Sequence, residues 1–562
     1  MKIVKLIITC LFFMFLVSSG FSQGYINNGA STVISSGTYL VVDGNFVNNT
    51  NVANGNVNLD GTIKVNGNWI NNASAGGVLS NVDNDGTVLF NGTTTFSGTS
   101  TAPFDFENLS VAPSSTVTIN ANVPVTVNTN IANSGTINVK SIAAGNGSLL
   151  VKGVISGSGL YKVDRYLSAS KWHLVSSPIT NALSGVFLNI YLKSYNEATN
   201  TFGALITPTT IPMPVGQGFS VWTNAANEIR TFSGTVNNGT VTPAVQLTGA
   251  AGIGTGWNLI GNPYPSAIDW NAASGWTKTG IANSVYVWNN NQYATFINGS
   301  ATNGGSRYIA MEQGFFVQTT SASANISMNN NVRVHNTVGY LKTDEEEPAD
   351  ILRVKVNMGV NSDEAVIAIR DNGSDIFNFE TDAVKLPGSI TSPQMHTIKT
   401  DNSQLAISAL TQVENVVGKY VYIDFAETGI HQLLYTHTLT GTSIPRLFDT
   451  KTLTVVEPNS PYSFQAIIGE SSARFQFIES LPMSIDNSQI NSNLTVWESN
   501  NNLFIVCAND EIIKQVCIYS VEGNLVSKGV QSSYDISHLS KAMYLVKVIT
   551  NKQIVTKKII RK

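Results

Sequence analysis

Residues 44–49 read Gly-Asn-Phe-Val-Asn-Asn, and 23 positions later residues 67–72 read Gly-Asn-Trp-Ile-Asn-Asn. A second frame repeats at an offset of 25, because residues 57–67 return in similar form as residues 82–92. Residues 132–139 resemble this frame as a looser third copy. Short alternating strands that end in Asn-Gly or Asp-Gly turns and repeat every ~20–25 residues are typical of a β-solenoid. We therefore predict a solenoid similar to a parallel β-helix over residues 23–160. An up-and-down sheet or barrel of hairpins is the alternative, because hairpins use the same turns.

A longer duplication follows the solenoid. Three segments recur in the same order: residues 172–178 and 257–263, residues 191–202 and 285–296, and residues 216–221 and 312–317. Each half opens with an apolar strand that a proline ends, and each closes with Gln-Gly-Phe before another apolar strand. This pattern predicts two related β units that form a duplicated β domain over residues 165–340.

The remaining third of the chain also alternates as strands do. The acidic run at residues 344–347, followed by Pro348, predicts a solvated, extended boundary. Alternating segments from Ile351 onward predict a β-sandwich over residues 349–480, and a small β domain over residues 484–562 completes the chain. The predicted fold class is therefore all-β throughout.

The first residues predict export. Lys2 and Lys5 precede an apolar run, and small residues surround the bond between Ser22 and Gln23, so residues 1–22 are interpreted as a secretory signal peptide. No second apolar run of ~20 residues follows, so no transmembrane anchor is expected in the mature chain. Acidic residues exceed basic residues by only four, and the basic residues form no cluster. The sequence therefore gives no support for nucleic-acid binding.

Three cysteines are present. Cys10 lies inside the apolar run, too early for lipid attachment, which leaves Cys507 and Cys517. The favoured interpretation is that both are small buried residues, and a disulfide between them is the alternative in an oxidising compartment.

The C-terminal segment carries a family resemblance. Residues 516–526, 534–548 and 557–562 resemble the type A C-terminal sorting domain (Por secretion) that the type IX secretion system of Bacteroidetes recognises. Ala542 departs from the glycine usual at that position. The resemblance implies a small immunoglobulin-like β-sandwich as the sorting domain. It also implies passage through the periplasm to the medium or the outer cell surface, with the type IX machinery as a partner. Residues 349–478 resemble a sandwich that often precedes such domains and has no assigned activity.

No pattern indicates catalysis, a cofactor or a metal site. The nucleophile elbow, the His-Glu-x-x-His pair and the phosphate-binding loop are all missing from the sequence. Asp60, Asp83 and Asp85 adjoin turns and are interpreted as turn caps, although Asp83 and Asp85 offer oxygens of the kind that bind Ca²⁺. The histidines His173, His431 and His437 are interpreted as packed side chains.

Tryptophans concentrate in the duplicated domain, which holds six of the eight. Trp172 and Trp257 occupy equivalent places in apolar strands and are expected in the core. Trp270, Trp276 and Trp288 lie among polar residues and are expected to be exposed, where aromatic faces stack on sugar rings.

These observations predict a non-catalytic protein exported to the surface or the medium. The expected role is that of an adhesin, or of a protein that binds extracellular polysaccharide or surface matrix, with Trp270, Trp276 and Trp288 as candidate ligand-binding residues. A purely structural surface component remains open. The main alternative is a carbohydrate-active enzyme, a polysaccharide lyase or hydrolase, with its site on the solenoid.

Overall fold

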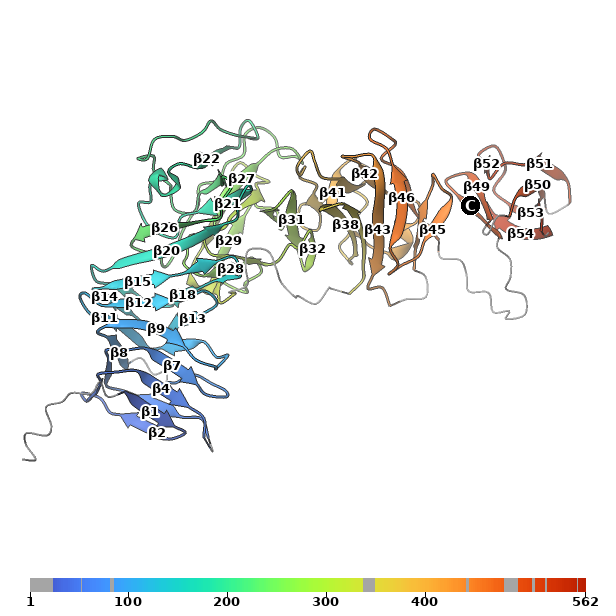
Figure 1. Ribbon diagram of the computed structural model, residues 1–562. Coiled ribbons are helices and arrows are strands. Elements are labelled where there is room, and N and C mark those ends of the chain that lie inside the picture. Colours follow the sequence, from blue (N-terminus) through green and yellow to red (C-terminus); the bar gives the residue numbers. More distant parts are fainter. Residues whose placement is uncertain are drawn as a thin grey trace, which may run out of the picture. The chain divides into compact units, whose positions relative to one another are not determined.

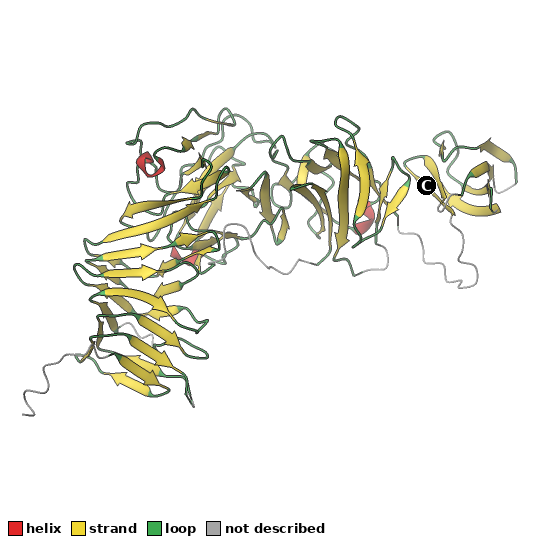
Figure 2. Cartoon of the chain, viewed as in Figure 1, coloured by secondary structure: helices red, strands yellow, loops and turns green. Residues whose placement is uncertain are grey.

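The computed structural model describes residues 24–51, 53–80, 85–336, 349–440, 444–479, 494–507, 511–520, 523–552 and 554–561. Strands and turns dominate them, and Figure 2 shows short 3-10 helices only: η1 (Ser184–Phe187), η2 (Asn330–Val332) and η3 (Val413–Val416). The predicted all-β class is confirmed. None of the helices in these ranges is long and apolar enough to cross a membrane. The chain divides into two compact units, Met1–Glu345 and Glu346–Lys562. The signal peptide, Asp83 and the acidic run lie outside the described residues.

The first unit begins as a three-sided solenoid, in which the strands of each coil stack on those of the next (Figure 1). The first side comprises β1 (Tyr25–Asn28), β4 (Phe46–Asn49), β7 (Trp69–Asn72), β9 (Thr93–Ser97), β12 (Thr116–Ile119), β15 (Thr136–Val139) and β20 (Leu160–Leu167). The second comprises β3 (Tyr39–Val42), β6 (Thr62–Val65), β8 (Thr87–Phe90), β11 (Asn108–Val111), β14 (Ile131–Asn133) and β19 (Ile155–Ser156). The third comprises β2 (Ser31–Ile34) with β5 (Asn56–Leu59), then β10 (Phe104–Phe106), β13 (Pro124–Val127) and β18 (Ser148–Val151). All these pairs are parallel, so the solenoid is confirmed and the hairpin alternative is wrong.

The register of the coils confirms two of the three predicted repeats. Phe46 pairs with Trp69 and Thr62 pairs with Thr87, as the offsets of 23 and 25 require. The third copy is wrong, because Thr136–Val139 pairs with β12 on the first side, whereas Thr62–Val65 lies on the second. Both strands point their second and fourth residues inward, so the same alternation suits either side.

Stacked side chains fill the solenoid. The ring of Phe46 lies 4.2 Å from that of Trp69, with an angle of 11° between their planes. Asn48 and Asn71 are also buried, and Nδ2 of Asn48 donates to the Gly55 carbonyl and to Oδ1 of Asn71. The interior is therefore apolar along the strands, and its asparagines hold the turns.

The solenoid continues directly into the duplicated domain. β20 pairs in parallel with β15 on one edge and antiparallel with β26 (Glu228–Gly234) on the other, which ends the parallel stack. The apolar core extends without a break from the coils to Val175, Phe219 and Phe232. A small hairpin, β16 (Ser141–Ile142) with β17 (Gly145–Asn146), packs against β20, where the Ser141 hydroxyl accepts from the Tyr166 backbone N–H.

The two halves of the duplicated domain share one strand order. The first half orders β21 (Trp172–Ser176), β25 (Gly218–Trp222) and β22 (Tyr191–Lys193), with the hairpin β23 (Tyr195–Asn196) and β24 (Thr201–Phe202) beside them. The second orders β27 (Trp257–Gly261), β34 (Gly314–Gln318), β30 (Val285–Asn289), β31 (Gln292–Ile297) and β32 (Ser300–Thr302). The second half adds β28 (Ala267–Asp269) with β33 (Tyr308–Ile309) and β36 (Arg333–Val334), and β29 (Trp276–Thr279) with β35 (Asn325–Met328). In each half the Gln-Gly-Phe strand lies between the other two, so the predicted duplication is confirmed.

Two basic side chains fix the second half to the solenoid. Arg333 is buried, and its Nη2 donates to the Leu149 carbonyl at 2.6 Å. His335 bonds through its two ring nitrogens to the hydroxyls of Thr126 and Ser148, each at 2.8 Å. The solenoid and both halves of the duplicated domain therefore pack as one body.

The second unit begins with one long hydrogen-bonded sheet that folds over on itself. Its strands are β37 (Ile351–Met358), β38 (Asn361–Ile369), β39 (Ala383–Val384), β40 (Gln394–Ile398), β41 (Gln404–Leu410), β42 (Tyr420–Asp424), β43 (Gly429–His437), β44 (Arg446–Asp449), β45 (Thr454–Val456), β46 (Tyr462–Ala466) and β47 (Phe475–Ile478). β46 lies at one end of the strand order and β47 near the other, yet the rings of Phe464 and Phe475 are 5.1 Å apart. The predicted sandwich is thus formed by one sheet.

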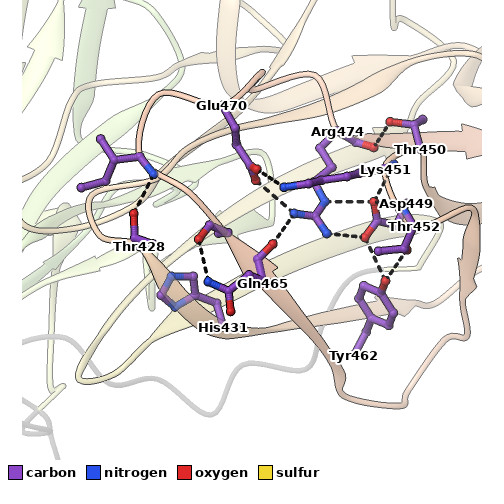
Figure 3. A network of polar contacts seen from close by, with 12 residues as sticks. Thr428, His431, Asp449, Thr450, Lys451, Thr452, Tyr462, Gln465, Glu470 and Arg474 are labelled. Atoms are coloured by element: carbon purple, nitrogen blue, oxygen red, sulfur yellow. Dashed lines mark hydrogen bonds and ion pairs between the residues drawn. The ribbon is translucent and has the colours of Figure 1, made fainter.

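A buried polar network joins those two ends (Figure 3). The guanidinium of Arg474 donates two parallel hydrogen bonds to Asp449, at 2.9 and 2.7 Å, and the Tyr462 hydroxyl donates to the same carboxylate at 2.8 Å. Burial alone would raise the pKa of Asp449, but these hydrogen bonds hold it below its usual value. The carboxylate is therefore a structural anchor between β44 and β46.

The last segment is a small sandwich of two antiparallel sheets. One contains β48 (Leu494–Ser499), β49 (Asn502–Cys507) and β52 (Ser533–Asp535), and the other contains β50 (Ile513–Ser520), β51 (Leu525–Gly529), β53 (Met543–Thr550) and β54 (Ile554–Ile560). Cys507 and Cys517 lie in different sheets and are free thiols, so the alternative of a disulfide is wrong. The favoured interpretation, that both are buried, holds for Cys517, whereas Cys507 is only half-buried.

Candidate ligand-binding site

The site lies where the two halves of the duplicated domain cross. Each Gln-Gly-Phe strand begins against the first strand of the opposite half, through bridges between Gln217 and Ile260 and between Gln313 and Val175. A Cβ on Gly218 would lie 2.5 Å from the Ile260 carbonyl oxygen, so only glycine allows this approach. The repeated motif therefore exists because the two halves pack reciprocally, and the crossing brings side chains of both halves together.

A pocket of ≈ 280 Å³ opens at this crossing. The first half contributes strand residues and one hairpin residue, and the second contributes two aromatic rings: Trp172, Leu174, Lys193, Phe202 and Ser220, with Trp288 and Tyr293. A second hollow of ≈ 310 Å³ shares Trp172 and Lys193 and adds Tyr191, Leu205 and Trp222. We call the two hollows together the aromatic cleft.

The rings of the aromatic cleft support one another. The centroids of Trp172 and Trp222 are 5.4 Å apart, and those of Trp288 and Tyr293 are 5.0 Å apart at an interplanar angle of 76°. Nε1 of Trp288 is buried, so this residue presents its carbon ring to the cleft. Burial raises the pKa of Tyr293, so its phenol stays protonated and can donate a hydrogen bond at neutral pH. The cleft therefore offers ring surfaces edged by polar groups.

The second half closes the equivalent place. Trp257 corresponds to Trp172, and its Nε1 donates to the Ile253 carbonyl of a loop that covers it. Gln318, which corresponds to Trp222, holds the same loop by donating to the carbonyls of Gly252 and Thr255. The two copies thus share the tryptophan and differ in the loop and in the residue that holds it, and the change from Trp222 to Gln318 is a signal present in the sequence.

The structure separates the three tryptophans that the sequence singled out. Trp288 lines the aromatic cleft. Trp270 is fully buried, and its Nε1 donates to the Asn283 carbonyl, so its expected exposure is wrong. Trp276 is half-buried and packs against Trp270, with the two centroids 5.1 Å apart, away from the residues that line the cleft.

Trp172 and Trp257, which occupy equivalent positions in the two halves, were both expected in the core, and one of them lies there. Trp257 is buried in the core, as predicted. Trp172 was expected there too, but it is half-buried and lines both hollows, because no loop covers it.

The other candidate residues occupy structural positions. Asp60 lies at a turn beneath Ile34, to whose carbonyl its backbone N–H donates, and Asp85 is exposed. His431 is buried between Phe425 and Phe464, and His437 lies beside Tyr435. Within the described ranges, no group of three or more His, Cys, Asp or Glu side chains could hold a metal ion. Burial, with the charges of Arg165 and Lys171, lowers the pKa of His173 to about 4, so its ring is neutral near pH 7.

The fold and the cleft define an all-β protein in which a solenoid carries a duplicated domain. Comparison with known families matches residues 499–562 to the secretion system C-terminal sorting domain, which confirms the type IX sorting signal. Residues 58–364, more than half of the chain, match the domain of unknown function DUF8693, and the chain belongs to that family. No curated protein and no solved structure matches the chain. The sorting domain indicates recognition by the type IX machinery and export to the medium or the cell surface.

Proposed function

We propose that the protein is a non-catalytic binding protein of the outer cell surface or the surrounding matrix, and that its ligand is a glycan held in the aromatic cleft. The observation that carries the proposal is the open ring-lined cleft of the first half, beside the closed equivalent in the second. Sugar rings stack on aromatic faces, and hollows of ≈ 280 and ≈ 310 Å³ suit one or two rings.

The chemistry of the lining supports binding over hydrolysis. Glycosidases place two carboxyl groups on either side of the bond they cleave, commonly ~5–10 Å apart. The side chains that line the two hollows are aromatic, aliphatic, hydroxyl and ammonium groups, with no carboxyl group among them. A ligand in the cleft therefore meets surfaces that hold a sugar and no acid or base pair that would cleave it.

The test is a screen of the purified protein against arrayed polysaccharides, with both binding and release of oligosaccharide recorded. W172A and W288A should each lower the affinity for a bound glycan at least tenfold, because a buried aromatic contact contributes more than ~1.4 kcal/mol. W276A is the matched control, since Trp276 is a half-buried tryptophan of the same domain outside the cleft.

Two results would contradict the proposal. Binding that survives W172A and W288A would place the ligand elsewhere. Released oligosaccharide would identify an enzyme instead. Thermal unfolding of each variant shows whether its fold is intact.

A further inference from the structure

Lys193 is the charged residue of the aromatic cleft, and its surroundings indicate what kind of glycan fits. It ends β22, where it pairs with Ser220 of β25, and it lines both hollows. Its Nζ lies 5.7 Å from the centroid of the Trp172 ring. Among the residues that the structure describes, none forms an ion pair or a hydrogen bond with this ammonium group. The cleft thus holds a cation that lies over the face of the Trp172 ring and forms no ion pair with the described residues.

The carboxyl oxygens of the nearest acidic residue in the sequence are engaged by other groups than Lys193. Glu197, four residues further on, is buried, and its carboxylate already accepts hydrogen bonds from the backbone and hydroxyl of Thr248 and from the Gly256 backbone. Lys171, next to Trp172, donates to Asn290 in the turn after Trp288 and adds a second positive charge on this side of the domain. The residues that line the cleft therefore include a lysine and no carboxyl group, although the whole chain is acidic.

A half-buried cation among apolar walls loses hydration that an anionic ligand can replace. In the second half, Tyr286 pairs with Phe316 as Lys193 pairs with Ser220, and its ring packs 5.0 Å from that of Trp257 in the copy whose cleft is closed. The charge therefore accompanies the open cleft and is not a requirement of the shared fold.

We propose that the aromatic cleft binds an anionic sugar residue, whose ring stacks on Trp172 and Trp288 and whose carboxylate or sulfate pairs with Lys193. This inference rests on the proposed function and narrows its ligand to acidic polysaccharides. The lysine acts as a point charge, so the pairing suits either anion.

The test compares two polymers with the same backbone, polygalacturonate and its methyl ester, by calorimetry with the whole protein. The charged polymer should bind on the order of tenfold tighter, as expected for one charge-assisted hydrogen bond. The preference should shrink as salt is raised. K193Q should abolish the preference, K193R should keep it, and W172A should weaken both polymers. A sulfated galactan, measured in parallel, tells whether sulfate can replace the carboxylate. An affinity that depends on Lys193, for either polygalacturonate or the sulfated galactan, supports the proposal.

Two outcomes overturn it, and they differ. If the protein binds the methyl ester as tightly as polygalacturonate, and K193Q changes nothing, the inference about charge fails and glycan binding stands. If neither these polymers nor the arrayed glycans bind, both proposals fail.

Discussion

At the scale of single residues, Glu312 occupies an unfavourable position in the duplicated domain. It is fully buried, both of its carboxyl oxygens have no hydrogen-bond partner among the described residues, and its φ is +57°. The equivalent residue of the first half is Gly216, with φ +79°, for which this conformation is unstrained. The backbone carbonyl of Glu312 accepts a hydrogen bond from the Ser176 backbone N–H, just as the carbonyl of Gly216 accepts one from the Gly261 backbone N–H. The turn is thus required by the reciprocal packing, and the carboxyl group is not.

We predict that Glu312 destabilises the first unit as pH rises. Burial raises the pKa of Glu312 from its ordinary 4.5 to about 8; nearby Arg165 opposes the rise and Asp164 adds to it. Well below pH 4.5 the group is protonated in both states and makes no pH-dependent contribution to stability. Between pH 4.5 and 8 only the unfolded chain ionises, so the free energy of unfolding falls as pH rises, by several kcal/mol in total. E312Q should flatten this part of the profile of Tm against pH, and E312G should also raise Tm at low pH by removing the strain at positive φ. A wild-type profile identical to that of E312Q would contradict the prediction.

At the scale of elements, the sequence allowed the solenoid to be predicted because its period is local. Inward Phe46 and Trp69 recur with the asparagines that hold the turns, and each strand needs only its own alternation to be recognised. The third copy failed because Thr136–Val139 has the same alternation as Thr62–Val65 but lies on another side of the coil. Period and alternation show that a segment belongs to a coil. The side of the solenoid on which a strand lies can be predicted only by counting every turn between that strand and the repeat it resembles.

The site was predicted less well, for a reason that also lies in the elements. Trp270 lies among polar residues in the sequence, but the strands β28 and β33 and the neighbouring Trp276 and Phe315 enclose it. Trp172 lies in an apolar strand, yet it is open because the loop that covers its counterpart has no equivalent. Exposure of a tryptophan depends on segments distant in sequence, which composition along the chain does not report.

We predict that the aromatic stack is essential to the coils. W69A should lower the free energy of unfolding of the first unit by about 3–5 kcal/mol, because it removes a buried ring that contacts Phe46 and Phe106. Ile70, the next residue of β7, points outward, so I70A is the matched control and should cost less than about 1 kcal/mol. Denaturant unfolding followed by circular dichroism measures both. Equal effects of the two substitutions would contradict the assigned inward and outward faces.

At the scale of the whole molecule, the aromatic cleft and the sorting domain belong to different units. The aromatic cleft lies within Met1–Glu345 and the sorting domain within Glu346–Lys562, and each segment has its own apolar core. A segment with its own core folds from its own contacts. Export and ligand binding should therefore be separable by truncation, which neither the composition nor the repeats alone would establish.

We predict that removal of residues 494–562 stops export and leaves the fold of the remainder unchanged. In a Bacteroidetes host with type IX secretion, the truncated chain should accumulate in the periplasm, because the machinery recognises the domain that has been removed. Cell fractionation and immunoblotting measure where the chain is found, and limited proteolysis of the periplasmic product shows whether the first unit is intact. C507S is a control that keeps the sorting domain, since Cys507 is a free thiol. It should be exported like the wild type. Truncated protein found in the medium or on the cell surface would show that a segment before residue 494 carries the export signal. A truncated chain that is degraded before fractionation would instead show that the remainder depends on the sorting domain for folding.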